Sequence, residues 1–473
     1  MMRLWRNEKM RTRNRRIHAV ALYVLLSIAS PALASVIFVD ADATGANDGS
    51  SWADAYYYLQ DALMFAVEGD EIKVAQGIYK PDDFVLSDRP SLGREETFHL
   101  INGVAIKGGY AGLGEPDPNA RDIKLYETIL SGDIGDEEDT CHVVTGSGTS
   151  ASAALDGFVV TGGMASSACD CWFGAGMYIY AGSPTVANCT FIGNWALDYG
   201  GGICNDGNSC PLFVNCAFIG NSATDGGGVD NEYSNPTFEN CLFTGNWVDE
   251  YNADSFSGGA MYNFHSSPAL INCTVSGNEV RQWWCYCGGI YNRGDDSRPM
   301  LTNCILWGNI DQYDDIQQAQ IAGGLPIVNY CCIEGLTGDL GGTGNVGDDP
   351  CFVDCGYRDT NGTPDDGDDD FWVDGDYHLK SQAGRWDPNE GRWVKDDVTS
   401  PCIDAGDPAD PVGPESFPNG GIVNMGAYGG TAEASRSYFG KPTCETIVAG
   451  DINGDCIVDF KDFALMAGHW LEL

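Results

Sequence analysis

A twelve-residue phrase recurs five times between residues 183 and 309, and this repetition constrains the fold more than any other feature of the sequence. The copies are SPTVANCTFIGN, CPLFVNCAFIGN, NPTFENCLFTGN, SPALINCTVSGN and RPMLTNCILWGN. Their central asparagines are 27, 25, 32 and 31 residues apart, at Asn188, Asn215, Asn240, Asn272 and Asn303. A period of this length indicates a solenoid, a propeller or a linear array of repeats.

The spacing of apolar residues within each copy selects the kind of solenoid. Apolar side chains come in short alternating runs that are rich in aromatic and β-branched residues, which is typical of strands and not of helices. A repeat of this length suits one coil of three short strands, and strands of successive coils then pair in parallel about 4.8 Å apart. We therefore predict an all-β fold, a right-handed parallel β-helix of about ten coils. It should span residues 35–434, with its clearest repeats at 156–310.

Stacking of the coils predicts three rows of like residues. The central asparagines should form a ladder at one corner, each amide bonding its own turn and the amides above and below. A second row, from Asn194 to Asn309 in the Gly-Asn turns, should adopt the left-handed conformation that tight corners need. The cysteine after each central asparagine should point inward as a small buried hydrophobe.

The repeats resemble those of polymorphic outer-membrane proteins, in which an F-x-G-N phrase alternates with a glycine pair before an apolar residue. The chain from residue 35 to residue 434 resembles secreted bacterial β-helix proteins of the pectin-lyase-like superfamily. This resemblance implies the fold more than an activity, because one scaffold hosts many functions.

The N-terminus predicts export. Residues 1–34 contain seven Lys and Arg residues, then an apolar run at 19–29, then Pro-Ala-Leu-Ala ending at Ala34. This pattern is typical of a signal peptide, and the run is short for an uncleaved membrane anchor. Cleavage would leave 18 Lys and Arg against 67 Asp and Glu, so nucleic acid and anionic membranes are excluded as partners. We predict a secreted, extracellular or cell-surface protein with no membrane span after cleavage.

The two ends of the solenoid should be closed by other elements. Residues 54–67 form the best amphipathic helix in the sequence, and we predict that this helix caps the open first coil. Strands are expected at 35–40 and 70–79. Residues 330–331 and 349–354 should form the last coils. An acidic loop follows with Asp365, Asp366, Asp368, Asp369 and Asp370; it is either a solvated loop or a calcium site.

The C-terminal residues 450–473 carry a candidate calcium loop, which a linker at 435–449 joins to the solenoid. Calcium prefers six or more oxygen ligands on a flexible loop. The side chains of Asp451, Asn453, Asp455, Asp459 and Asp462, with the Ile457 carbonyl, fall at suitable spacings. A helix should follow from Phe460.

This segment resembles an EF-hand-like dockerin type I repeat, which implies bound calcium and a cohesin-like or other cell-surface partner. Cys456 stands where such loops usually have glycine, and a single repeat is present. A calcium-stabilised tail or a surface-sorting tag is therefore the alternative.

The chain has 19 cysteines, an odd number that leaves at least one unpaired. In an exported protein, close local pairs are candidates for disulfides. We predict Cys204 with Cys210, Cys351 with Cys355, and Cys444 with Cys456. The C-x-C pairs at 169–171 and 285–287 suggest a shared zinc ion, although four coils separate them.

Catalysis is weakly supported. Residues 146–335 contain three arginines and no lysine, which is few for a lyase that must neutralise a polyuronate. Asp198 and Asp225 precede glycine turns on adjacent coils and are the candidate catalytic pair, since carboxylates one coil apart approach the spacing in a retaining glycosidase.

Aromatic residues favour binding of sugars, because sugar rings stack on exposed aromatic faces. Seven lie largely in turns and loops: Trp172, Trp195, Tyr199, Trp247, Trp283, Trp284 and Trp307. We predict a calcium-binding carbohydrate-interaction or structural module. The alternatives are a polysaccharide lyase or glycoside hydrolase, and an adhesin.

Overall fold

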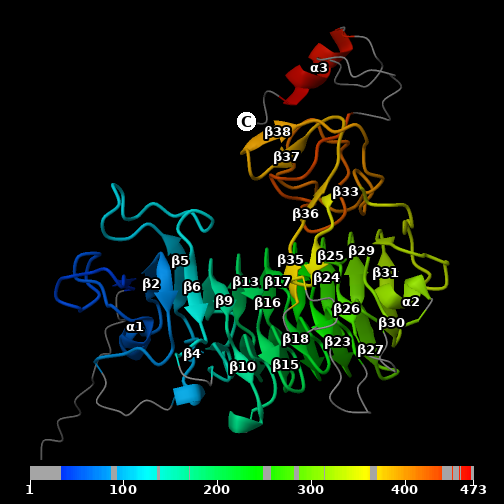
Figure 1. The fold of residues 1–473 in the computed structure, drawn as a ribbon. Coiled ribbons are helices and arrows are strands. Elements are labelled where there is room, and N and C mark those ends of the chain that lie inside the picture. The colour runs from blue at the N-terminus through cyan, green and yellow to red at the C-terminus, as the bar shows by residue number, and fades with distance from the viewer. Residues whose placement is uncertain are drawn as a thin grey trace, which may run out of the picture. The chain divides into compact units, whose positions relative to one another are not determined.

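The computed structural model describes residues 34–86, 93–135, 139–169, 171–248, 257–281, 287–313, 315–362, 370–438, 450, 458 and 460–469. Within these residues, strands of successive coils pair in parallel and stack into four sheets (Figure 1). The right-handed parallel β-helix is therefore confirmed.

Each coil contributes one strand to each of three long sheets. Sheet A has ten strands: β1 (Val36–Val39), β2 (Glu71–Ala75), β5 (Ala105–Tyr110), β8 (Ala154–Asp156), β12 (Thr185–Ala187), β16 (Leu212–Val214), β20 (Thr237–Glu239), β24 (Ala269–Ile271), β28 (Met300–Thr302) and β31 (Ile327–Asn329). Sheet B has nine: β3 (Gly77–Tyr79), β6 (Thr128–Ser131), β9 (Val159–Thr161), β13 (Thr190–Ile192), β17 (Ala217–Ile219), β21 (Leu242–Thr244), β25 (Thr274–Ser276), β29 (Ile305–Trp307) and β32 (Cys332–Ile333). Sheet C has eight: β4 (Phe98–His99), β7 (Val144–Thr145), β11 (Met177–Tyr180), β15 (Ile203–Asp206), β19 (Val229–Glu232), β23 (Met261–Phe264), β27 (Ile290–Arg293) and β30 (Ile321–Gly323).

A fourth, narrower sheet was not predicted. Sheet D consists of two-residue strands: β10 (Met164–Ala165), β14 (Trp195–Ala196), β18 (Ser222–Ala223), β22 (Trp247–Val248) and β26 (Glu279–Val280). The last four of these strands follow the Gly-Asn turns and β10 follows Gly162-Gly163, so the middle coils contain four strands and not three. Two residues per strand are too few to show a period in the sequence.

The interior is filled by like residues that lie above one another. Phe191 stacks on Phe218, and Phe218 on Phe243, with ring centroids 5.3 and 4.7 Å apart. The cysteines after the central asparagines are buried, as predicted, and each thiol donates to main-chain carbonyls; Cys241 contacts the carbonyl oxygens of Glu239 and Phe213 at 3.4 and 3.6 Å. Continuous burial of this kind stabilises a chain whose coils have no core of their own.

The second asparagine row forms a continuous amide ladder. Asn194, Asn221, Asn246, Asn278 and Asn309 are buried, and each Nδ2 donates to the Oδ1 of the next at 2.8–3.0 Å, up to Asn309. The prediction that these residues adopt the left-handed conformation is wrong. The glycine before each of them takes that conformation, with φ between 58° and 71°. Having no Cβ, glycine does so without steric cost, which leaves the asparagine free to point inward.

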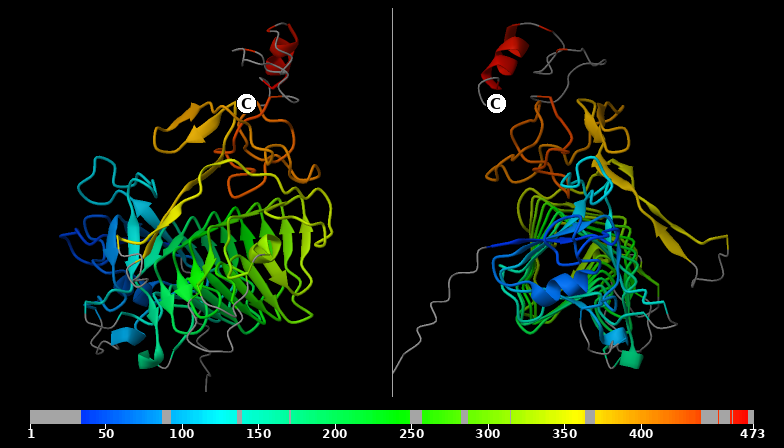
Figure 2. Two further views of the ribbon diagram at one scale, coloured as in Figure 1. Left: turned by 45° about the vertical axis from the view of Figure 1, so that its right-hand side comes forward. Right: turned by 90° about the vertical axis from the view of Figure 1, so that its left-hand side faces the viewer.

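The predicted N-terminal helix is shorter than expected. Helix α1 spans Leu59–Phe65, and its Leu59, Ala62 and Leu63 belong to the main hydrophobic core. Figure 2 (right) shows α1 beside the first coils. Its role as a cap stays a prediction. The other helices are α2 (Ile316–Gln320) and α3 (Phe460–His469), with 3-10 turns at Gly93–Glu95 and Ser167–Cys169. None of the helices in the described ranges has the length and apolarity that a membrane crossing requires.

The parallel coils end earlier than predicted. The prediction holds for residues 330–331, which lie in the last coil directly before β32 begins at Cys332. It is wrong for residues 349–354, which form no coil. Instead β33 (Phe352–Asp354) pairs antiparallel with β36 (Asp376–Leu379), β34 (Tyr357–Asp359) with β35 (Phe371–Val373), and β37 (Arg385–Asp387) with β38 (Arg392–Val394). Phe352, Tyr377 and Leu379 pack with Ile305 and Cys332, on the outer face of sheet B. The described residues of 351–362 and 370–438 thus cover the late coils and do not extend them.

Two of the predicted disulfides are absent. Cys204, Cys210, Cys351 and Cys355 are all free thiols. Cys204 is held on β15, where its Sγ lies 3.3 Å from a carboxylate oxygen of Asp230, so it is not available to its neighbour in sequence. The third pair, Cys444 and Cys456, lies outside the described residues. Cys141, for which we made no prediction, is disulfide-bonded.

Candidate functional site

The central asparagines occupy the corner between sheets A and B. Their φ angles lie between 50° and 56°, so this row, and not the Gly-Asn row, adopts the left-handed conformation that Asn tolerates. The predicted ladder is only partly present. Asn215 donates to Asn188 at 3.3 Å and Asn303 donates to Asn272 at 3.2 Å. Asn240 joins neither pair.

The later corner asparagines bind the C-terminal segment. Asn240 Nδ2 donates to the carbonyls of Ala427 and Gly429 at 2.9 and 2.7 Å. Asn272 donates to the Asn424 carbonyl at 3.1 Å. The ladder breaks because residues 424–429 present main-chain acceptors directly over this corner. The two earlier asparagines have no such cover.

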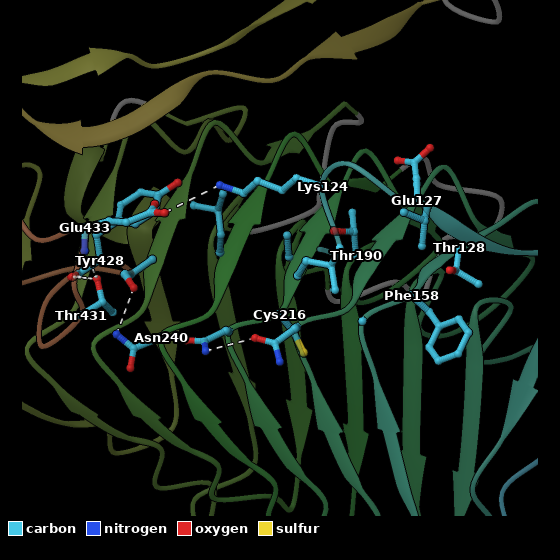
Figure 3. A pocket seen from close by; sticks show the side chains of 18 residues that line it. Lys124, Glu127, Thr128, Phe158, Thr190, Cys216, Asn240, Tyr428, Thr431 and Glu433 are labelled. Carbon is cyan, nitrogen blue, oxygen red and sulfur yellow. Dashed lines mark hydrogen bonds and ion pairs between the residues drawn. The ribbon is translucent and has the colours of Figure 1, made fainter. Parts of the chain in front are cut away.

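A groove of about 630 Å³ lies where this cover stops (Figure 3). Its floor includes Asn188, Asn215 and Thr190. One wall carries Lys124 and Glu127 from the segment before β6, and the other carries Tyr428, Thr431 and Glu433. Lys124 Nζ lies 3.8 Å from a Glu433 carboxylate oxygen, which connects the two walls. The groove therefore combines amides, hydroxyls, the aromatic rings of Phe158 and Tyr428, and one lysine facing two glutamates.

A buried histidine holds the C-terminal wall rigid. The His378 ring stacks on Tyr428 with centroids 3.7 Å apart, and its two nitrogens lie 2.6 Å from Asp376 and 3.4 Å from Glu433. Burial alone would lower the pKa of His378, but the two carboxylates outweigh it and raise that pKa. The hydrogen bond with His378 in turn lowers the pKa of Glu433. Burial raises the pKa of Tyr428, so its phenol stays neutral.

A second polar cluster lies on the outer face of sheet C. The strand register stacks five outward-facing residues in one column: Tyr178, Cys204, Asp230, Tyr262 and Tyr291. Asp230 is only 1% exposed. Burial, together with the neighbouring carboxylates of Glu232, Asp225 and Asp206, raises the pKa of Asp230 well above its usual value. Burial and the neighbouring carboxylates thus both favour the protonated form of Asp230.

The predicted catalytic pair, Asp198 and Asp225, is not an equivalent pair. Asp225 pairs with Tyr199 of the adjacent coil and not with Asp198, so the two aspartates are offset by one residue in register. Asp225 is buried and accepts the Ser257 N–H at 2.5 Å. Asp198 is half-buried, and burial raises its pKa.

Sequence reasoning missed Asp230, although a signal was present. In every coil from β11 to β27, an outward residue follows the first inward apolar residue of the sheet C strand. In β19 this residue is an aspartate, which breaks a column of aromatic and thiol side chains. A carboxylate in such a column is a candidate for a functional group because it is costly to bury there.

The candidate calcium ligands Asp451, Asn453, Asp455, Ile457 and Asp459 lie outside the described residues. Asp462 is described: it is buried in the first turn of α3, which begins at Phe460 as predicted. Elsewhere in the described chain, no group of three or more His, Cys, Asp or Glu side chains is arranged to hold a metal ion. Asp370 of the acidic loop pairs with Arg358.

The predicted aromatic face is divided among several environments. Trp172 and Trp195 are exposed. Trp247 is covered by the guanidinium of Arg281, 3.8 Å from its ring centroid, and Tyr199 stacks on Phe173. Trp307 lines a separate pocket. Trp283 and Trp284 lie outside the described residues, so the aromatic residues do not form one continuous surface within the described chain.

Comparison with known proteins supports the fold. Residues 149–306 match the family described as right handed beta helix region, and residues 339–406 match the family described as disaggregatase related. No curated protein matches the sequence.

Three solved structures are similar to this chain at low identity. A pectate lyase, Pel9A, is 13% identical, with 84% of this chain and 96% of that chain covered and a TM-score of 0.40. A rhamnogalacturonan lyase is 12% identical, with 58% and 76% covered and a TM-score of 0.32. The pectin methylesterase of Aspergillus niger is 12% identical, with 67% and 86% covered and a TM-score of 0.24. The fold assignment itself rests on the strand pairing.

Proposed function

We propose that this protein is an exported carbohydrate-interaction module that binds a neutral polysaccharide in the groove beside the corner asparagines. The observation that carries the proposal is the interruption of the C-terminal cover. This cover accepts hydrogen bonds from the amides of Asn240 and Asn272, whereas Asn188 and Asn215 line the 630 Å³ groove without a bond to the segment; Asn240 borders the groove as well.

The chemistry of the groove suits a sugar chain. Amides and hydroxyls both donate and accept hydrogen bonds, as sugar hydroxyls do. The volume falls within the range of ligand sites in proteins, about 300–1,000 Å³. Lys124 is opposed by Glu127 and Glu433, and the formal net charge of the chain is −43. A polyanion would therefore be repelled, and a neutral chain would not.

The proposal also includes export of the protein and calcium binding by its C-terminal loop. The N-terminal signal-like segment would direct secretion, and the loop at 451–462 would bind calcium and dock a cohesin-like or other cell-surface partner. In this arrangement the solenoid binds the polysaccharide and the tail fixes the protein to a surface.

Affinity electrophoresis tests the groove. Full-length protein lacking residues 1–34 would be run with calcium through gels containing hydroxyethylcellulose, galactomannan or polygalacturonate. We expect retardation by a neutral polymer and none by polygalacturonate. Thr190→Val and Tyr428→Phe should each reduce retardation several-fold. Thr185→Val, on the adjacent strand outside the groove, is the matched control. Equal retardation of all four proteins would contradict the proposal.

A second candidate function is glycoside hydrolysis on the outer face of sheet C. It is favoured by Asp230, whose raised pKa suits a general acid, beside Asp206 and Glu232 as potential bases. Release of reducing sugar from the same neutral polymers would support it if Asp230→Asn abolished the release. Complete absence of product from every polymer would exclude it for those substrates.

A further inference from the structure

A second pocket, of about 300 Å³, lies under the ribbon formed by β34 and β35. Its lining includes Trp307, Trp372, Tyr357, Ile310, Glu279 and Arg358. Trp307 belongs to sheet B and Glu279 to sheet D, whereas the other aromatic residues come from the ribbon. The pocket therefore exists only because the ribbon folds back onto the late coils.

Trp372 is fixed in position by two glycines of the repeat. A Cβ added at Gly245 or Gly277 would lie 2.1 or 2.4 Å from atoms of its indole ring, so the ring rests directly on the main chain. Asp374 accepts a hydrogen bond from Thr244 at 3.0 Å, which ties the same strand end to sheet B. The indole is thus a rigid wall, and a rigid aromatic surface loses little entropy when a ligand stacks on it.

The charges around the pocket balance. Arg358 Nη1 lies 3.3 Å from both carboxylate oxygens of Glu279, and its Nη2 pairs with Asp370. Arg281 also contacts Glu279, at 3.4 Å. Two guanidinium groups thus oppose two carboxylates, and the pocket offers no net charge to attract an ion.

Two polar atoms of this network lack partners. Arg358 Nε and Asp370 Oδ1 are buried and have no hydrogen-bond partner. Leaving a buried donor or acceptor unsatisfied is costly, and such groups are rare in proteins. Arg358 lines the pocket together with two indole rings, and an orphaned donor beside aromatic rings matches the hydroxyl groups and C–H faces of a sugar ring.

We propose that this pocket binds one neutral hexopyranose unit, with the sugar ring against Trp307 and Trp372 and a hydroxyl on Arg358 Nε. The inference rests on the proposed function, because it assigns a second subsite for the same class of ligand. Its location is distinct: the groove is built on Thr190 and Ala217, whereas the pocket is built on later coils. The net negative charge of the chain disfavours uronates.

Isothermal titration calorimetry of the calcium-loaded mature chain tests the pocket, with cellohexaose and mannohexaose as probes and a galacturonate hexamer as the acidic comparison. We expect Trp307→Ala to weaken binding of the preferred neutral hexaose at least tenfold. Tyr357→Ala is the second variant: the side chain is 55% exposed, so its removal should leave the fold intact and still lower affinity. Arg358→Lys keeps the charge but removes Nε, and should weaken binding as well. Trp195→Ala, an exposed tryptophan outside both sites, is the matched control.

The outcomes separate the two sites. Loss of affinity in the pocket variants, with Trp195→Ala unchanged, supports the inference. If Tyr357→Ala and Arg358→Lys bind the hexaose as tightly as wild type but Thr190→Val binds it more weakly, the pocket is not a sugar site. The groove then remains the proposed site. Tight binding of the galacturonate hexamer in the wild type overturns the assignment to neutral sugars. Absence of binding by any hexaose overturns the pocket, while retardation in polysaccharide gels still tests the groove independently.

Discussion

The inner and corner asparagine rows of the solenoid have the same residue type and the same period but different environments. In the inner row, each amide is buried and donates to the next amide and to a carbonyl of the preceding coil; Asn246 contacts Asn278 at 2.9 Å and the Phe218 carbonyl at 2.8 Å. In the corner row, the amides face outward and form hydrogen bonds with the groups beside them. Asn240 binds the C-terminal segment, whereas Asn215 is exposed at the groove.

The difference shows what decides whether a repeated residue is structural or functional. The inner amides satisfy one another completely, so nothing else can bind to them. The corner amides keep unused hydrogen-bonding capacity because the left-handed turn directs them away from the coil. In this protein a segment far away in the sequence uses part of that capacity, and we propose that a polysaccharide uses the rest.

A substitution in the inner asparagine row should cause the largest loss of stability. Asn246→Ala would orphan the Phe218 carbonyl and the main-chain and side-chain N–H groups of Asn221. Unsatisfied buried groups cost about 1–3 kcal/mol each, so we expect a loss of about 3–5 kcal/mol in the free energy of unfolding. Urea denaturation followed by circular dichroism measures it. A loss below that of a corner variant would remove the distinction between the rows.

A pH titration addresses the segment that covers the corner row. Glu415 accepts the N–H groups of Asn424 and Gly430, and burial raises its pKa from 4.5 to about 7. Because the folded protein holds this proton more tightly than the unfolded chain, the stabilisation is complete below pH 4.5 and is lost as pH rises towards and past 7. At 1.36 kcal/mol per pKa unit, the difference between wild type and Glu415→Gln should change by about 3 kcal/mol across this range. A pH-independent difference would show that the pKa of Glu415 is the same in the folded and the unfolded chain.

Substitution of a corner asparagine that the C-terminal segment covers should cause an intermediate loss of stability. Asn240→Gly removes the hydrogen bonds to Ala427 and Gly429 but suits the positive φ of 53°. We expect a loss of about 1–2 kcal/mol and faster amide exchange at residues 424–431, measured by hydrogen–deuterium exchange. Unchanged exchange there would mean that the segment is held by other contacts.

The open part of the corner row should show the smallest effect on stability. Asn215→Gly removes one hydrogen bond to Asn188 at an exposed position whose φ of 52° suits glycine. We expect a change below about 1 kcal/mol in the free energy of unfolding, together with weaker retardation in neutral polysaccharide gels. Loss of stability comparable to that of Asn246→Ala would assign this asparagine to the fold and not to the groove.

Much of the solenoid could be predicted from its repeats. The period placed the strands of sheets A and B, and the alternation placed Phe191, Phe218 and the repeat cysteines inside, because burial in a stacked coil depends on the local pattern. The roles of the two asparagine rows could not be assigned in the same way. Both lie at a bend between two strands, and only the main-chain angles distinguish the inward amide from the outward one.

The candidate sites were harder to predict for a different reason. Asp198 and Asp225 occupy similar places in the sequence, yet a one-residue change in register puts Asp225 beside Tyr199. The groove and the aromatic pocket both need residues 351–438, whose antiparallel ribbon carries no repeat. Contacts such as Asn240 with Ala427 join positions 187 residues apart, and no local pattern encodes them.

The sequence by itself determined the right-handed solenoid, its buried cysteines and its stacked core, because each of these depends on residues that recur at one period. Only the tertiary structure decided which corner asparagines are covered, which carboxylate on sheet C is buried, and which tryptophans share a pocket. These features arise where the non-repeating C-terminal segment meets the repeats or where two coils slip by one residue. They are set by contacts across long separations in the chain, which have no periodic signature.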